Sequence, residues 1–402
     1  MTQDSDEARL LALRAQFPTL EHTTYLISNS LGAMPAGARE DLDLYGKTWT
    51  ERGVRAWAET WWALAQEVGD TIGGLFNAPA GTVSMHQNVT LASSVVISCF
   101  DWSRKRNGVV YTDMNFPSVR YLYERLATAM GARVNVVESP DGVGVPTEAI
   151  LDAIDETTLL VPISHVLFRS AWIQDAAAIC KKAAEVGAHV VLDAYQSVGT
   201  VPVDVQALGC SFLVGGVLKW LCGGPGGAFL YVRPDLLESL EPKLTGWMAH
   251  PEPFDFAPPP MPYTEGAYRF MNGTPNVPGL YAGRRGPAIV AEAGIDAIRR
   301  KSMRQTARLV DAAQAEGWNV TAPLDPARRG GTVAVDVPHA YHVKLELLRR
   351  EVIVDYRPGA GIRISPHFYT TDAECEHAVD QIKDILATDA WKRHEGVKYT
   401  VT

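Results

Sequence analysis

Short apolar runs alternate with segments of helical spacing through the middle of the chain. Six runs are strand candidates: GVVYTD, RVNVVE, TLLVPIS, HVVLDA, SFLVGG and GAFLYV, between residues 108 and 232. Helical spacing appears in the segments SVRYLYERLATAM, TEAILDAID and DAAAICKKAAEVG. Because the strand candidates are apolar throughout rather than alternating, we expect them to be buried on both faces. The pattern predicts an α/β fold with a mostly parallel sheet covered by helices on both faces.

The two ends of the chain carry different patterns. Residues 34–76 have helical spacing, and VSMHQNVTLASSVVISCF predicts a strand end, a turn and a buried helix. Residues 240–280 are irregular, and residues 287–317 predict one long helix. The last segment indicates a strand, a helix, a strand and a helix, with TVAVDV and GIRISP as the strands. We therefore expect a smaller α+β domain at 286–402, a large domain at 46–285, and an N-terminal segment at 1–45 that packs on the small domain.

Composition places the chain among ordinary globular proteins. It has 402 residues, 47% of them apolar and 21% charged, and a net charge of −9 without charge runs, which argues against nucleic acid as a partner. Five cysteines stand far apart with no CxxC pair, so neither a metal site nor a disulfide framework is expected. The acidic N-terminus is not typical of a signal peptide, and no window approaches the ~20 apolar residues of a membrane span. A cytoplasmic location is expected.

Three polar residues stand where chemistry is expected in a parallel sheet. Asp193 ends the strand candidate HVVLD, Lys219 follows SFLVGG, and Thr90 opens a helix after HQNV. Taken singly, each has an ordinary structural explanation, as a helix cap or a solvated side chain. Together they match pyridoxal phosphate (PLP): a carboxylate for the pyridinium nitrogen, an amine for the aldehyde and a helix N-terminus for the phosphate.

The sequence around these residues resembles the class V aminotransferase family of PLP enzymes, and within it the kynureninase-like members. The block LDAYQSVGTVPVDVQALGCSFLVGGVLKWLCGGPGGAFLYV resembles the family's segment from the aspartate to the lysine. Further similarities lie in YLISNSLGAMP, NFPSVRYLYE, GWMAHPEPFDF, EGAYRFMNGTPNVPGLYA and GIRISPHFYTT. The resemblance covers Phe17 to Tyr369 and implies PLP fold type I and a homodimer with shared active sites.

The resemblance also implies a role for each matching residue. Lys219 would form the Schiff base with the cofactor and move protons, and Asp193 would pair with the pyridine nitrogen. The remaining cofactor contacts would be made by Val89, Thr90, Phe116 and Gln196, and by Thr274 toward the phosphate of the neighbouring subunit. The substrate would be held by Arg363 at its α-carboxylate, with Ser30, His165 and Trp247 in the pocket.

Departures from the kynureninase pattern concern the substrate. Kynureninases usually carry His where this chain has Gln196, Tyr where it has Leu218, and Asn where it has Thr274. The chain also lacks the loop that supplies a cysteine desulfurase with its nucleophile. We expect a lyase or hydrolase that cleaves at Cβ of an α-amino acid other than kynurenine. An aminotransferase, an epimerase, a C–S lyase, or a catalytically inactive binding module remain alternatives.

Overall fold

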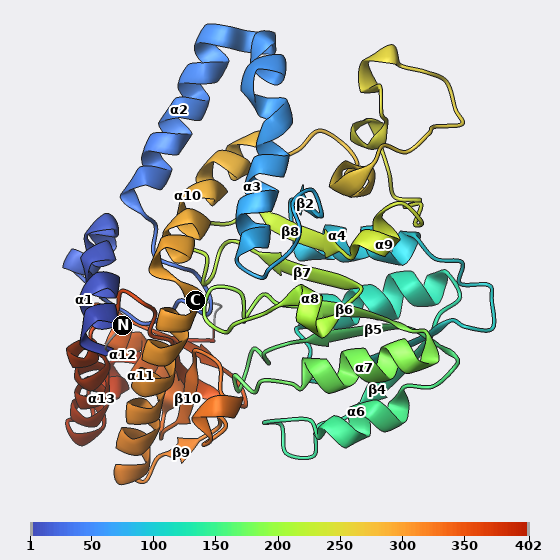
Figure 1. Cartoon of the computed structure of the whole chain (residues 1–402). Coiled ribbons are helices and arrows are strands. Elements are labelled where there is room, and N and C mark those ends of the chain that lie inside the picture. Colours follow the sequence, from blue (N-terminus) through green and yellow to red (C-terminus); the bar gives the residue numbers. More distant parts are fainter. Residues whose placement is uncertain (1–2, 400–402) are drawn as a thin grey trace.

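The computed structural model describes residues 3–399 and has a seven-stranded sheet, which lies at the centre of the large part of the molecule (Figure 1). The strand order is β2-β8-β7-β6-β5-β3-β4. Its strands are β2 (Val83–His86), β3 (Gly108–Thr112), β4 (Arg133–Val137), β5 (Thr158–Ser164), β6 (His189–Asp193), β7 (Phe212–Gly216) and β8 (Ala228–Val232). Only β8 runs antiparallel to both of its neighbours, and the other pairs are parallel. The mostly parallel sheet expected from the sequence is confirmed.

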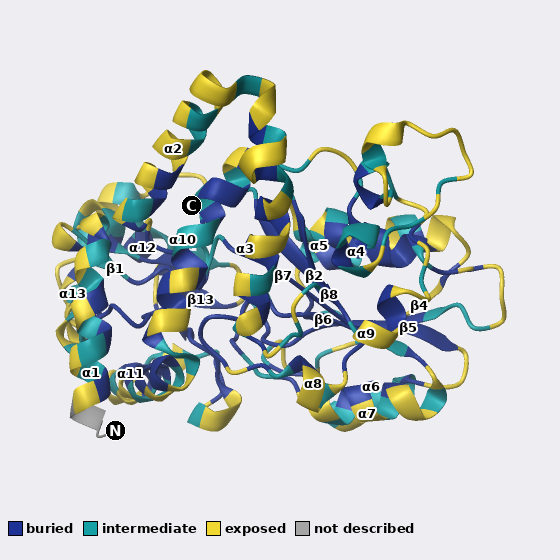
Figure 2. Ribbon diagram, turned by 45° about the horizontal axis from the view of Figure 1, so that its top comes forward, coloured by how far each residue is buried: buried dark blue, intermediate teal, exposed yellow. Residues whose placement is uncertain are grey.

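Each face of this sheet is buried by its own set of helices. Alternate residues of β6 point to opposite faces: Val190 and Leu192 join one apolar core and Val191 joins the other. The first core includes residues from α3 (Trp62–Gly74), α6 (Thr147–Ala153), α7 (Ala176–Val186) and α10 (Val277–Ala293). The second includes α4 (Val89–Ser98) and α5 (Pro117–Leu122). Figure 2 shows the inner strands buried and the outer faces of α6 and α7 exposed, as two-sided burial of a parallel sheet requires. The edge strand β4 has no buried residue, so the two-sided burial expected for RVNVVE is wrong.

A smaller antiparallel sheet, β12-β13-β10-β9, forms the C-terminal part. Its strands are β9 (Asn319–Val320), β10 (Val333–Asp336), β12 (Asp355–Arg357) and β13 (Gly361–Ile364), and its helices are α11 (Ile295–Ala315), α12 (Ala340–Arg349) and α13 (Asp372–Ala387). The single helix expected at 287–317 is in fact two, because Gly294 adopts a φ of +79° and ends α10. The boundary expected at 285/286 falls inside α10, and the division into domains stays a prediction.

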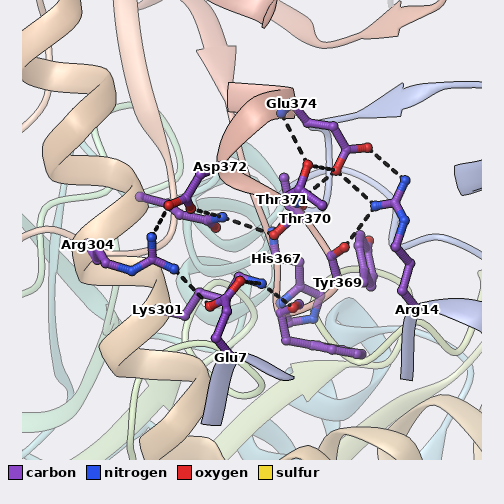
Figure 3. Close-up of polar contacts among 12 residues, drawn as sticks. Glu7, Arg14, Lys301, Arg304, His367, Tyr369, Thr370, Thr371, Asp372 and Glu374 are labelled. Carbon is purple, nitrogen blue, oxygen red and sulfur yellow. Dashed lines mark hydrogen bonds and ion pairs between the residues drawn. The ribbon is translucent and has the colours of Figure 1, made fainter. Parts of the chain in front are cut away.

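The N-terminal segment lies against the C-terminal part (Figure 1). Strand β1 (Thr24–Tyr25) pairs in parallel with β11 (Val352–Ile353). Figure 3 shows the polar contacts beside it: Glu7 of α1 (Gln3–Ala12) contacts Lys301 and Arg304 of α11 at 2.8 Å each. These ion pairs tie helices that are almost 300 residues apart in sequence.

The remaining elements complete the large part of the molecule. Helix α2 (Ala36–Arg52) forms a hairpin with α3, and both pack against α10 (Figure 1). Two π-helical turns, Trp57–Trp61 and Tyr123–Ala127, precede α3 and follow α5. The short helices α8 (Val205–Leu208) and α9 (Pro234–Leu237) follow β6 and β8 in the chain. Among residues 3–399, no helix has the length and apolar character that a membrane crossing requires.

Candidate active site

A cavity of about 220 Å³ opens beyond the carboxyl ends of β5, β6 and β7. Ligands bind at this edge of open parallel sheets because the loops leaving the strands diverge there. The cavity is lined by Asn88, Val89, Thr90, Phe116, Ser118, Val119, Ser164, Val166, Phe168, Asp193, Tyr195, Gln196, Leu218 and Lys219. Six of the residues named from the sequence are among them: Val89, Thr90, Phe116, Asp193, Gln196 and Lys219.

The amine of Lys219 lies between two aromatic rings. Its Nζ is 4.6 Å from the centre of the Tyr195 ring and 5.6 Å from that of Phe116. Burial, with a smaller contribution from the positive charge of Arg363, lowers the pKa of Lys219 to about 8 against the opposing effect of Asp193. An amine with this pKa is neutral in a large fraction of molecules near pH 8, so Lys219 can act as a nucleophile or a base.

Asp193 is a buried carboxylate at the end of β6, level with Ser164 of the neighbouring strand. Its Oδ1 accepts the backbone N–H of Tyr195 at 3.0 Å. Burial raises the pKa of Asp193, and the Tyr195 N–H and the charge of Lys219 oppose that rise. A buried carboxylate with few partners favours a cationic neighbour, which a protonated ring nitrogen supplies.

The N-terminus of α4 forms another wall of the cavity. Asn88 caps the helix, and its side chain accepts the N–H of Leu91 at 2.9 Å. The N–H groups of Val89 and Thr90, in the first turn, have no partner among residues 3–399. Free N–H groups and the positive end of the helix dipole make this a site for an anion such as phosphate.

Gln196 and Phe116 differ in how much freedom their side chains keep. Gln196 is buried; its Nε2 donates to the carbonyl of Asn29 at 3.0 Å, and its Oε1 accepts Trp220 Nε1 at 2.9 Å. One N–H and one lone pair of the amide therefore remain for a ligand. Phe116 is 42% exposed and meets Phe168 edge to face at 5.2 Å, so its ring still has a face to offer a ligand.

Arg363 lies in the smaller sheet and is bound by an aspartate that the sequence analysis did not single out. Its Nε donates to Asp355 Oδ1 at 2.8 Å, and its Nη2 donates to Asp355 Oδ2. Nη2 also donates to Ser30 Oγ at 3.2 Å, and the Ser30 hydroxyl donates to Asp355 Oδ2 at 2.5 Å. Nη1 donates to the carbonyl of Phe168, a residue that lines the cavity. Ser30 and Arg363 therefore lie together at the edge of the cavity.

Replacing Asp355 by alanine is expected to destabilise the protein by about 3–5 kcal/mol, because it leaves the guanidinium of Arg363 buried without its counter-charge. Urea denaturation followed by circular dichroism measures the change. Asp336→Ala, which removes an exposed aspartate of the same sheet, is the matched control and should change the free energy of unfolding by less than about 0.5 kcal/mol. Equal effects of the two substitutions would contradict the prediction.

Five residues named from the sequence do not line the cavity of the described chain: Ser30 and Arg363, which lie at its edge, and three others. His165 is buried, with its pKa lowered to about 4 by burial, whereas its neighbours Ser164 and Val166 do line the cavity. Trp247 packs against Trp62, with 5.6 Å between the ring centres. Thr274 is exposed on the loop that leads into α10. Their roles toward substrate or cofactor stay predictions.

Tyr195 is a cavity residue that sequence reasoning missed. A Cβ added at Gly216 would lie 2.3 Å from its Cζ and Oη, so the ring packs directly on the backbone of β7. Burial raises the pKa of Tyr195 well above its ordinary value, which keeps the phenol neutral. Its position two residues after Asp193 was the available signal, because the turn after a strand that ends at a site also faces that site.

Comparison with known proteins decides the family. The model of the family described as aminotransferase class-V matches residues 40–374. The chain belongs to the class V aminotransferase family. A kynureninase of Pseudomonas fluorescens is 30% identical over 409 residues, covering 98% of this chain and 96% of its own length. A kynureninase of Burkholderia pseudomallei (strain 1106a) is 30% identical, covering 96% and 94%.

Solved structures of the same fold are more distant in sequence. The apo cysteine desulfurase of Thermococcus onnurineus NA1 superposes with a TM-score of 0.83 at 22% identity, covering 94% of this chain and 98% of its own. The cystine C–S lyase C-DES superposes with a TM-score of 0.83 at 20% identity, covering 92% and 99%. A variant of C-DES carries glycine covalently linked to its PLP cofactor. These likenesses confirm PLP fold type I.

As a class V aminotransferase-fold enzyme, the protein uses pyridoxal 5′-phosphate and acts on amino acids. The cavity fits this cofactor: the unpaired N–H groups of Val89 and Thr90 suit the phosphate, the buried Asp193 suits the ring nitrogen, and the Lys219 amine suits the aldehyde. When bound, PLP supplies a ring that withdraws electrons from the substrate Cα. The expectation of a PLP enzyme is confirmed.

Proposed function

We propose that this enzyme is a kynureninase-like lyase or hydrolase that cleaves a bond at Cβ of an α-amino acid and releases an alanine-type product. The supporting observation is the joint placement of Lys219 and Asp193 in one cavity with Arg363 at its edge, in a chain 30% identical to kynureninases over nearly its whole length. Arg363 binds the α-carboxylate, and Ser30 supports it. Lys219 removes the α-proton and returns it at a different atom, while Asp193 keeps the ring nitrogen protonated.

The preferred substrate is proposed to differ from kynurenine. Thr274 offers one hydroxyl where kynureninases carry an asparagine amide, which has both a donor and an acceptor. Leu218, which lines the cavity, stands where kynureninases carry a tyrosine. A site that has lost polar groups discriminates less well between substrates with and without a polar substituent. A β-substituted or γ-oxo amino acid with a different side chain beyond Cβ is therefore favoured.

The cysteines argue against desulfuration that uses a protein thiol. Among residues 3–399, no cysteine lines the cavity, and the nearest in sequence to Lys219, Cys222, is buried. Burial raises the pKa of the Cys222 thiol to about 12, so it is a poor nucleophile. All five cysteines are unpaired, which suits the reducing cytoplasm proposed as its location.

A product assay separates the proposal from its alternatives, an aminotransferase, an epimerase or a C–S lyase. The holoenzyme is incubated with kynurenine and a panel of β-substituted and γ-oxo amino acids, and products are identified by mass spectrometry and chiral chromatography. We expect alanine from a panel member and slow or absent turnover of kynurenine. A kcat/KM for kynurenine of ~10⁴ M⁻¹s⁻¹ or above would contradict the substrate proposal, and a keto acid or the opposite enantiomer as main product would contradict the reaction.

The enzyme is also proposed to be a homodimer with shared active sites. Thr274 is exposed on a loop outside the cavity of its own chain, and a partner's phosphate would give its hydroxyl a function. Thr274→Ala should weaken PLP retention by roughly tenfold, the value of one charge-assisted hydrogen bond. PLP release is measured by dialysis and absorbance, and the oligomeric state by sedimentation. A stable, active monomer would refute the shared site.

A further inference from the structure

The guanidinium of Arg363 has almost no donors left for a substrate. Of its five N–H groups, one on Nε and both on Nη2 are directed to Asp355 and Ser30, and one on Nη1 is directed to the carbonyl of Phe168. The Nε–Nη2 edge, one of the two edges that can grip a carboxylate with parallel hydrogen bonds, is filled by Asp355. A single Nη1 N–H remains.

Asp355 also cancels the charge of Arg363. Its side chain is fully buried, and the two residues lie directly opposite each other in the β12–β13 pair. The pKa of Asp355 is lowered in spite of its burial, because Arg363 lies against it and Ser30 donates to it. The pair is therefore an ionised, neutral unit, and an incoming carboxylate meets the negative charge of Asp355 as well as the positive charge of Arg363.

Arg357 brings a second guanidinium to the same place with most of its donors unused. It stands two residues from Asp355 in β12, on the same side of the strand, with its Nη2 3.3 Å from Asp355 Oδ2. Its Nη1 donates to the carbonyl of Tyr356 at 2.8 Å. Among residues 3–399 its guanidinium has no other hydrogen-bond partner, and its side chain is 22% exposed. Burial is the largest cause of the lowered pKa of Lys219, and the charges of Arg363 and Arg357 both add to it. Both guanidiniums therefore interact electrostatically with the amine.

We propose that Arg357 is the residue that gives the carboxylate site its net positive charge, and that it binds the substrate α-carboxylate together with the remaining Nη1 of Arg363. Asp355 holds both arginines, so the cluster of Arg357, Asp355 and Arg363 carries one net positive charge. This matches one carboxylate of the substrate. The inference deepens the proposed function, because it rests on the assignment of the α-carboxylate to this end of the cavity.

The test compares two ligands that differ only in the carboxylate. L-Alanine and ethylamine are titrated into the holoenzyme, and dissociation constants are taken from the change in the visible absorption band. Wild type is compared with Arg357→Gln, Arg357→Lys and Arg363→Gln. Arg104→Gln, which removes the same charge from a side chain that is 77% exposed, is the matched control, and melting temperatures report on folding.

Arg357→Gln should weaken L-alanine binding by roughly ten- to hundredfold, the range for a charged hydrogen-bond partner. Ethylamine binding should change less than about twofold, because that ligand has no carboxylate for the site to lose. Arg357→Lys keeps the charge and should bind L-alanine within about fivefold of wild type, since the net charge is what the inference assigns to this position. Arg104→Gln should match wild type for both ligands.

The outcomes separate the inference from the proposed function. If Arg363→Gln weakens L-alanine binding and Arg357→Gln does not, the inference is overturned and the carboxylate role of Arg363 stands. If neither variant weakens it, both are overturned. If Arg357→Lys loses as much affinity as Arg357→Gln, or if ethylamine binding falls equally, the assignment of the net charge to Arg357 is wrong.

Discussion

Replacing Lys219 by alanine is expected to lower kcat by about 10⁴-fold or more, while the protein still binds PLP. The amine lies close to the rings of Tyr195 and Phe116 in the cavity, and the substitution removes both covalent attachment and proton transfer. The N–H groups of α4 and the Asp193 carboxylate remain in place to hold the phosphate and the ring. We expect an inactive protein that binds PLP noncovalently, so that dialysis removes the cofactor.

Borohydride reduction and peptide mapping check this assignment without a turnover assay. In wild type, the pyridoxyl group should be fixed on the peptide that contains Lys219. Lys181→Ala, which removes an exposed lysine of α7, is the matched control and should keep both label and activity. A label on any lysine other than Lys219, or turnover by Lys219→Ala near the wild-type rate, would contradict the assignment.

Replacing Asp193 by asparagine should lower kcat by roughly two to three orders of magnitude, with a smaller effect on PLP affinity. Asparagine keeps the shape of the side chain and can still accept the Tyr195 N–H, but it carries no negative charge. Without that charge the pKa of the ring nitrogen falls, and the ring withdraws electrons less strongly. Steady-state kinetics and cofactor titration of the apoprotein measure the two effects.

The matched control for Asp193 is Asp152→Asn, which neutralises an exposed aspartate of α6 and should leave kcat unchanged. A restored rate in Asp193→Glu, which returns the carboxylate on a longer side chain, would support a role for the charge itself. Near-normal kcat in Asp193→Asn would show that the electron-withdrawing power of the cofactor has another source in this protein.

Much of the large sheet could be predicted because its strands, apart from the edge strand β4, are buried on both faces. A run such as TLLVPIS has apolar side chains at positions that point both ways, and this pattern is visible without knowledge of the partners. Asp193 and Lys219 could be predicted for a related reason: each follows such a run, and the carboxyl ends of parallel strands meet at one edge. Local sequence and global fold agree in these segments.

The carboxylate end of the site was only partly predictable. Arg363 was found by resemblance, but Asp355 and Arg357 lie in a three-residue strand whose position depends on pairing with β13. The helix end at Gly294 was missed because one glycine in a helical pattern costs only about 1 kcal/mol and does not by itself mark where a helix ends. Thr274 and Trp247 lie in the irregular segment 240–280. Its apolar residues show no regular spacing, so the sequence pattern does not predict where these side chains point.

Completion of the site also has an order in time. Ser30 and Asp355, which hydrogen-bond at the carboxylate end, are 325 residues apart, and β1 pairs with β11 near the opposite end of the chain. During synthesis from the N-terminus, residues 24–30 emerge long before their partners exist. The seven-stranded sheet can form first. The carboxylate end of the site can be completed only after β12 and β13 have left the ribosome. We therefore expect the nascent chain to pass through a stage in which Lys219 is in place and the carboxylate end of the site is still incomplete.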